Sequence, residues 1–202
     1  YAKGLDSGHI IVVGKGEVEA QPDTIRVSFS LKCKAETMQA GQTKMRESIK
    51  AVTEKITQYN KDAVVYTNYS SSFPVFEGGL LGYEFDSCLI ATSPNVEDAN
   101  GLVDAVVEAG ATSVHSVNYL LENKDEAYIK ALKLAKQNAE DKANAIYGNL
   151  TLKGLKEEAV YNYCEGRQNE KIKISAKVTA FYVVNSQNLE NNETASLKNA
   201  FS

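Results

Sequence analysis

Two stretches of this chain alternate between apolar and polar residues, one from residue 25 to 34 and the other, apart from Phe181, from residue 171 to 182. Successive side chains of a β-strand point to opposite faces of a sheet, so a period of two predicts strands with one buried and one hydrated face. The chain must therefore contain a sheet that is covered on one side. The apolar positions are Ile25, Val27, Phe29, Leu31 and Cys33 in the first stretch, and Ile172, Ile174, Ala176, Val178, Ala180 and Tyr182 in the second.

Three segments have the apolar spacing of helices. The first begins after Thr37, a good N-cap residue, and the second follows Ser93-Pro94-Asn95 and ends at Gly110. The third and longest runs from Asp125 to Tyr147 and carries an alanine at every fourth position, which predicts close packing against a sheet or another helix. The residues expected to face inward are Met45, Ile49, Val52, Ile56 and Tyr59 in the first helix, Val96, Ala99, Val103, Val106 and Val107 in the second, and Ala131, Ala135, Ala139 and Ala143 in the third.

The remaining segments rich in β-branched and aromatic residues predict further strands, with Gly78-Gly79 joining two of them in a hairpin. With the two alternating stretches, the order of elements predicts an α+β fold with a mostly antiparallel sheet. Its core is βαββαβ, the split βαβ arrangement, with a third long helix and added N- and C-terminal strands that extend this sheet or form a second one. The further strands are expected at His9–Ala20, Val64–Phe76, Leu80–Thr92, Val114–Leu121 and near Glu158–Cys164, the last followed by a turn through Gly166.

A chain of 202 residues suits one hydrophobic core. We therefore expect a single domain over residues 9–185. Residues 1–8 contain few apolar side chains and predict a flexible N-terminus, and residues 186–202 predict a polar, frayed tail.

The charge of the chain argues against nucleic acid as a partner, because its net charge is −4 and its sequence pI is about 5.4. A nucleic-acid-binding domain needs a basic surface that displaces counterions from phosphates. No stretch is long and apolar enough for a spanning helix, so we do not expect an integral membrane protein. The first residue is Tyr1 and not a methionine, which is consistent with removal of a secretory signal peptide.

Few residues suggest catalysis, metal binding or a cofactor. His9 and His115 are far apart, with no other ligand type at metal-site spacing, and the cysteines Cys33, Cys88 and Cys164 form no CxxC pair. One disulfide with a free thiol, three buried thiols, and a reactive Cys88 or Cys164 all remain open. Gly14-Lys15-Gly16 follows a strand but lacks the third glycine and the helix that a dinucleotide motif requires. We expect no enzyme, no metal and no cofactor.

Tyrosines gather at the central hairpin, where Tyr66, Tyr69 and Tyr83 form a candidate interaction surface. Aromatic side chains are enriched where proteins contact one another, although tyrosine also packs within ordinary sheets. Asp23, directly after Pro22, is expected to act as a side-chain acceptor in a turn.

Several of these motifs, in this order, resemble the SIMPL domain family, which includes bacterial periplasmic immunogenic proteins. The resemblance covers roughly residues 10–185. Its motifs are Val13-Gly14-Lys15-Gly16-Glu17-Val18, Gln21-Pro22-Asp23-Thr24, Tyr66-Thr67, Phe73-Pro74-Val75-Phe76, Gly82-Tyr83, Val103-Asp104-Ala105, Gly110-Ala111-Thr112 and the alanine row of the long helix.

The resemblance implies an exported, non-enzymatic protein of the periplasm or cell surface that self-assembles or binds other envelope proteins, with a role in oxidative or envelope stress for some members. It carries over no catalytic residues, and it implies that Gly14, Gly16, Pro22, Asp23, Gly82 and Gly110 serve backbone and turn geometry. The alternative function is a module of the periplasm or cell surface that binds a small ligand on a concave sheet face or under the turn at residues 78–82.

Overall fold

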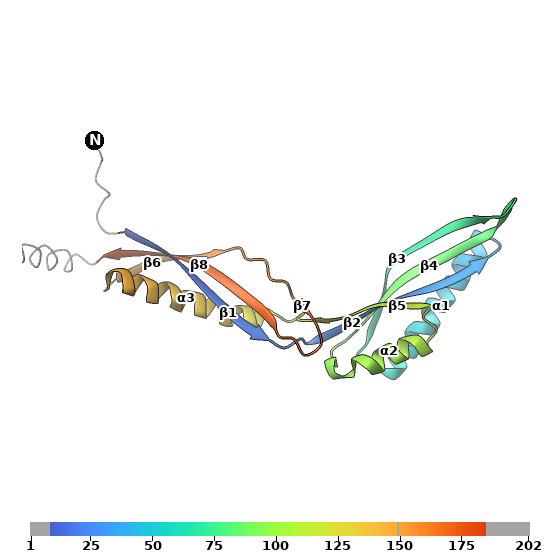
Figure 1. The fold of residues 1–202 in the computed structure, drawn as a ribbon, viewed down its shortest axis with the longest axis horizontal. Helices are drawn as coiled ribbons and strands as arrows, with labels where there is room; N and C mark the ends of the chain where they lie inside the picture. Colours follow the sequence, from blue (N-terminus) through green and yellow to red (C-terminus); the bar gives the residue numbers. More distant parts are fainter. Residues whose placement is uncertain (1–8, 149, 185–202) are drawn as a thin grey trace, which may run out of the picture. The chain divides into compact units, whose positions relative to one another are not determined.

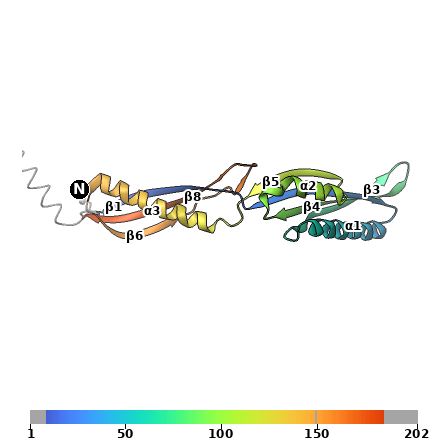
Figure 2. The same ribbon diagram turned by 90° about the horizontal axis from the view of Figure 1, so that it is seen from below.

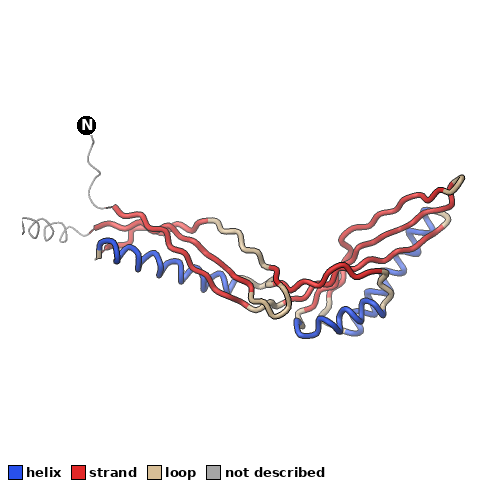
Figure 3. Tube along the Cα trace, in the orientation of Figure 1, coloured by secondary structure: helices blue, strands red, loops and turns tan. Residues whose placement is uncertain are grey.

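The computed structural model describes residues 9–148 and 150–184, which divide between two compact units with separate cores (Figure 1, Figure 3). The five-stranded unit comprises Gln21–Glu122 and Glu165–Ile172. The three-stranded unit takes its described residues from 9–20, 123–164 and 173–184. The stretch expected to form one domain, residues 9–185, therefore contains two cores. The predicted flexible N-terminus and frayed tail lie outside the described residues.

The five-stranded unit is antiparallel, with the strand order β3-β4-β2-β5-β7. Strand β4 lies between β2 and β3, which α1 connects, and β2 lies between β4 and β5, which α2 connects. This is the predicted split βαβ arrangement, and the α+β prediction is confirmed. The elements are β2 (Thr24–Ala35), α1 (Met38–Tyr59), β3 (Val64–Phe76), β4 (Leu80–Ser93), the short 3₁₀ helix η1 (Val96–Asp98), α2 (Ala99–Glu108), β5 (Ser113–Leu120) and β7 (Glu165–Gly166).

Helices α1 and α2 lie together on one face of this sheet (Figure 1, Figure 2). The alternating apolar residues of β2 point to that face, and Ile25, Val27 and Phe29 are completely buried. Two residues predicted to face inward are about half exposed, Tyr59 at the end of α1 and Val107 in α2. The buried stripe of α2 contains the predicted Ala99 and Val106 together with Leu102 and Ala105, a spacing that keeps one helical face toward the sheet.

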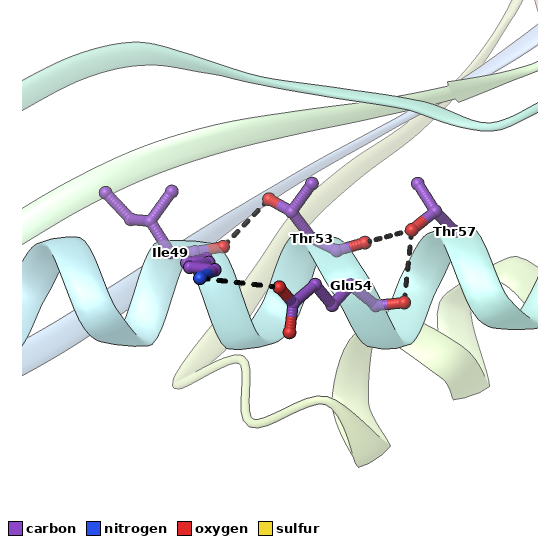
Figure 4. Close-up of polar contacts among 5 residues, drawn as sticks. Ile49, Thr53, Glu54 and Thr57 are labelled. Carbon is purple, nitrogen blue, oxygen red and sulfur yellow. Dashed lines mark hydrogen bonds and ion pairs between the residues drawn. The ribbon is translucent and has the colours of Figure 1, made fainter.

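Helix α1 begins where predicted, since Thr37 accepts a hydrogen bond from the backbone N–H of Ala40 at 3.2 Å. Within the helix, the hydroxyls of Thr53 and Thr57 donate to the carbonyl oxygens of Ile49 and Thr53, each at 2.8 Å (Figure 4). These bonds to the preceding turn satisfy the hydroxyls without interrupting the helix.

The three-stranded unit has the strand order β1-β8-β6, so the terminal strands form a second sheet. Helix α3 lies along one face of it (Figure 1). All six apolar positions predicted to be buried in β8 are buried, as are the four alanines predicted in α3. No helix in the described ranges is long and apolar enough to cross a membrane. The elements are β1 (His9–Ala20), α3 (Asp125–Tyr147), β6 (Leu150–Glu158) and β8 (Ile172–Val184).

The packing of α3 on β1 explains both the alanine row and the two glycines of β1. A β-carbon on Gly14 would lie 2.0 Å from the carbonyl oxygen of Ala135, and one on Gly16 would lie 2.0 Å from that of Ala131. Only hydrogen fits at this distance, so the two backbones meet because all these side chains are minimal. The glycines are a packing requirement and not part of a phosphate-binding loop.

The strand predicted near Glu158–Cys164 is wrong. Strand β6 occupies Leu150–Glu158, and its pairing with β8 shifts between Leu152 and Gly154, which breaks the alternation that would have revealed it. Residues 159–164 form no strand; there the side chain of Asn162 hydrogen-bonds the backbone N–H and carbonyl of Ser175 at 2.7 and 2.9 Å. Gly166 was predicted to lie in a turn. It belongs to β7 and pairs with Tyr119 of β5.

Candidate functional site

Strand β3 is an outer strand of the five-stranded sheet, and no other strand among the described residues pairs with its outer edge. Its sequence, VVYTNYSSSFPVF, contains no charged residue. An outer strand presents backbone N–H and C=O groups that can pair with another chain, and natural proteins usually protect it with charges, prolines or bulges. Here Pro74 lies near one end of the strand, and Asn68 is the extra residue of a bulge opposite β4.

The other outer strands of the described sheets are either very short or carry charges, both of which discourage pairing with another chain. Strand β7 has only two residues. Strand β1 carries Lys15, Glu17 and Glu19, and β6 carries Lys153 and Lys156 together with two glutamates at its end. Among the described strands, β3 alone is both long and uncharged at a sheet edge.

The face of the five-stranded sheet opposite α1 and α2, which we call the open face, carries an aromatic row along β3. Tyr66, Tyr69 and Phe73 stand opposite Ile90, Cys88 and Glu84 of β4, whose neighbours in sequence point into the core. The three aromatic side chains are 43%, 53% and 47% exposed. Sequence reasoning missed Phe73, although its spacing from Tyr69 repeats the alternation of the strand.

Tyr83, the third tyrosine of the predicted interaction surface, lies on the opposite side of the sheet. It stands opposite Pro74 of β3 and packs, partly buried, against the core beneath α1. The structure therefore brings Tyr66 and Tyr69 onto one face and separates Tyr83 from them.

Two hydrogen-bonded pairs lie on the open face. The Ser30 hydroxyl lies 2.7 Å from Nε2 of His115, and the Ser28 hydroxyl lies 3.5 Å from the Cys88 sulfur. A hydroxyl beside an imidazole is the start of a nucleophile–base pair. Ser30, however, is only 1% exposed, and among the described residues no third side chain hydrogen-bonds His115 to orient it. The arrangement therefore satisfies buried polar groups and offers no route for a substrate to the Ser30 hydroxyl.

Sequence reasoning did not find the Ser30–His115 contact, because the two residues lie 85 positions apart in the chain. The signal available was the pair of small hydroxyls at alternate positions of β2. Their partner depends on the register of β5, where a bulge follows Ser28 and brings His115 next to Ser30.

The open face also carries two ion pairs between β2 and β4. Lys32 lies 3.3 Å from Asp86, and Lys34 lies 2.6 Å from Glu84. These four residues and Phe73 of β3, together with Cys33, Phe85 and the α1 residues Lys44 and Ser48 from the side of the helices, line a hollow of about 470 Å³ at the edge of the sheet. This volume lies within the range of ordinary small-molecule sites.

The other residues identified from sequence occupy structural positions. The Asp23 carboxylate accepts hydrogen bonds from the Thr24 hydroxyl at 3.0 Å and from the backbone N–H of Glu122 at 2.8 Å, beside Pro22. Gly110 has φ +111°, a conformation that favours glycine, and lies just beyond the end of α2. A β-carbon on Gly82 would lie 2.6 Å from the Ala35 carbonyl oxygen.

The cysteines and histidines form no metal cluster in the described part of the chain, where no three His, Cys, Asp or Glu residues lie close enough to hold an ion. Cys33, Cys88 and Cys164 are free thiols; Cys88 is buried and the other two are partly buried. His9 is the exposed first residue of β1 and belongs to the other unit from His115.

A family model described as "SIMPL: Protein of unknown function (DUF541)" matches residues 10–188. No curated protein matches the chain. Solved structures that match part of the chain include AtUAH in complex with glyoxylate, at 10% identity over 61% of this chain and 34% of the other, and an amidase of the hydantoinase/carbamoylase family from Burkholderia phymatum, at 9% identity over 56% and 31%. Both have TM-scores of 0.30. The chain spans about a third of the length of these structures, and likeness at this level carries no information about activity.

Proposed function

We propose, from the premise that the chain belongs to the SIMPL family, that it is a non-enzymatic, exported protein of the cell envelope that acts by self-assembly or by binding other envelope proteins. The observation that carries this proposal is the long, uncharged edge of β3. An uncharged outer strand beside an exposed aromatic row supplies both the backbone groups and the apolar surface that a protein partner needs.

The aromatic row supports the same function. Exposed aromatic side chains contribute large contact area, and Tyr66 and Tyr69 can also donate hydrogen bonds through their hydroxyls. They lie on the same strand as the free edge, so one partner can pair with the backbone of β3 and cover these rings at once. We place the protein in the periplasm or at the cell surface, with a role in envelope stress, from its family resemblance.

The solution mass of the protein tests this function. We expect size-exclusion chromatography with light scattering to give a discrete oligomer of the 22.0 kDa chain that does not depend on concentration. Tyr69→Lys places a charge on the exposed edge and is expected to shift the oligomer toward monomer. Tyr161→Lys is the matched control, because Tyr161 is a more exposed tyrosine of the other unit, at 87%.

A 22 kDa monomer at every concentration would reject self-assembly. If crosslinking in intact cells then trapped no envelope protein on β3 either, the whole proposal would be rejected.

The hollow beside Lys32 and Lys34 favours a second candidate function, the binding of a small ligand. Its lining combines three lysines and two carboxylates with Cys33, Ser48 and the aromatic rings of Phe73 and Phe85, which suits a small molecule with an anionic group and an apolar part. A rise in melting temperature with such a compound, lost in Lys44→Ala, would support this alternative. No rise across a broad collection of metabolites and cell-wall fragments would argue against it.

A further inference from the structure

We propose that the partner of the β3 edge is β3 of a second copy of this chain, paired antiparallel about a two-fold axis at Ser70. This inference rests on the proposed function and specifies the partner and its register. The result would be one continuous sheet across two five-stranded units.

The position of Ser70 follows from the bulge in β3. Asn68 is the extra residue, because Thr67 pairs with Leu89 and Tyr69 pairs with the adjacent Cys88. When the bulge residue Asn68 is left out of the count, Ser70 is the middle position of the segment from Val64 to Val75. An antiparallel pair centred on Ser70 therefore overlaps along the whole of this segment, whereas a shift in either direction shortens the overlap.

The same register matches the two faces of the strand. The bulge reverses the alternation, so that Val64 and Tyr66 before it and Tyr69, Phe73 and Val75 after it all point to the open face. Directly opposed residues of an antiparallel pair share a face, and a slip by one residue exchanges the faces.

With the axis at Ser70, Tyr66 stands opposite Phe73 of the second copy, and Val64 stands opposite its Val75. Thr67 then stands opposite Ser72 on the side of the helices. Aromatic pairs and apolar pairs of this kind stabilise neighbouring strands, so the aromatic rows of the two copies become one surface.

Charge also favours a second copy as the partner. In a symmetric antiparallel pair, a charged residue is repeated on the facing strand, and like charges directly opposite each other are destabilising. Strand β3 has no charged residue and avoids this repulsion altogether. Pro74 lacks an N–H donor, but in each copy it stands opposite Val65 of the other near an end of the overlap, so its effect is confined to the two ends of the pair.

Cysteine cross-linking between mixed chains tests the register. In a background with Cys33, Cys88 and Cys164 replaced by serine, we introduce Val64→Cys into one preparation and Val75→Cys into another. Opposed side chains have β-carbons about 5 Å apart, whereas the two copies of Val64 would be roughly 30 Å apart. We therefore expect disulfide-linked dimers only after the two preparations are mixed and allowed to exchange, and a linked dimer of Ser70→Cys by itself.

The melting temperature and solution mass of the background variant are compared with those of the natural sequence. If the triple replacement unfolds, Cys88 is retained, because it is buried and reacts slowly. The same cysteines introduced at Thr151 and Val183, which are paired within one chain of the other unit, control for oxidation efficiency.

Each outcome bears on the proposal. Links at Ser70 and in the Val64–Val75 mixture support it. An oligomer of the expected mass without these links would overturn this pairing while leaving self-assembly intact. A chain that stays monomeric and forms no link would overturn both the pairing and self-assembly.

Discussion

The carbonyl oxygen of Ala135 lies only 2.0 Å from the point where a β-carbon on Gly14 would stand. Helix α3 and strand β1 are therefore in backbone contact. This contact requires glycine in the strand and alanine in the helix, because larger side chains would hold the two backbones apart.

Replacement of Gly14 by alanine should destabilise the protein. The new methyl group would meet a backbone oxygen, which cannot move aside as a flexible side chain can, so α3 must shift away from β1. Overpacking of this kind lowers the free energy of unfolding by about 3 kcal/mol. Urea denaturation of Gly14→Ala measures the loss. Gly79→Ala is the control, because no heavy atom lies within 4 Å of its added β-carbon, and a similar loss in both variants would contradict the close packing.

Replacement of Ala135 by leucine should disrupt the same contact from the helix side. Ala135 is completely buried, whereas the adjacent Leu134 is 48% exposed. We expect the melting temperature to fall by several degrees in Ala135→Leu, as about 1–3 kcal/mol of overpacking implies. Leu134→Ala should change it little, because exposed substitutions usually alter stability by less than about 0.5 kcal/mol. An unchanged melting temperature of Ala135→Leu would contradict the close packing of α3 against β1.

The hydrogen bond between Tyr59 and Asp98 should contribute to stability at neutral pH and lose that contribution in alkali. The Tyr59 hydroxyl donates to the Asp98 carboxylate at 2.6 Å, and this bond raises the pKa of Tyr59 above 10.0. A raised pKa means that the fold favours the neutral hydroxyl. The stabilisation is therefore fully present below the pKa of an unfolded tyrosine and is lost as pH rises through the higher folded value.

Chemical denaturation of Tyr59→Phe and the natural sequence between pH 7 and 11 measures this effect. We expect the natural sequence to be more stable at pH 7 and the difference to shrink above pH 10. Tyr161→Phe is the control, because its side chain is almost fully exposed. A difference that stays constant with pH would contradict the role of the hydroxyl.

The three cysteines should differ in their reaction with a thiol reagent. Cys33 and Cys164 are partly buried, whereas Cys88 is 4% exposed and lies beside Ser28. A cysteine reacts as its thiolate and only where the reagent can reach it, and burial of the side chain prevents both. We expect labelling followed by mass spectrometry to modify Cys88 last under native conditions and all three after unfolding. Rapid labelling of Cys88 under native conditions would contradict this expectation and would indicate that the sheet opens readily around Cys88.

Local patterns predicted most of the secondary structure. The alternation in β2 and β8, the cap at Thr37 and the alanine row of α3 each depend on neighbours within a few residues, so periodicity alone was sufficient to predict them. The order of elements also predicted the split βαβ core, because such connections allow few arrangements. The same reasoning failed for β6, where a bulge between Leu152 and Gly154 disrupts the period.

The sequence by itself thus determined which residues form strands and helices and which of their faces are apolar. Only the tertiary structure decided that these elements form two cores, that Tyr83 lies across the sheet from Tyr66 and Tyr69, and that Ser30 meets His115. The physical reason is that the period of apolar residues shows which face of a strand or helix is buried, but not which other element covers that face. Strand order and register join residues far apart in the chain, and one bulge, such as that at Asn68, reverses every face that follows it.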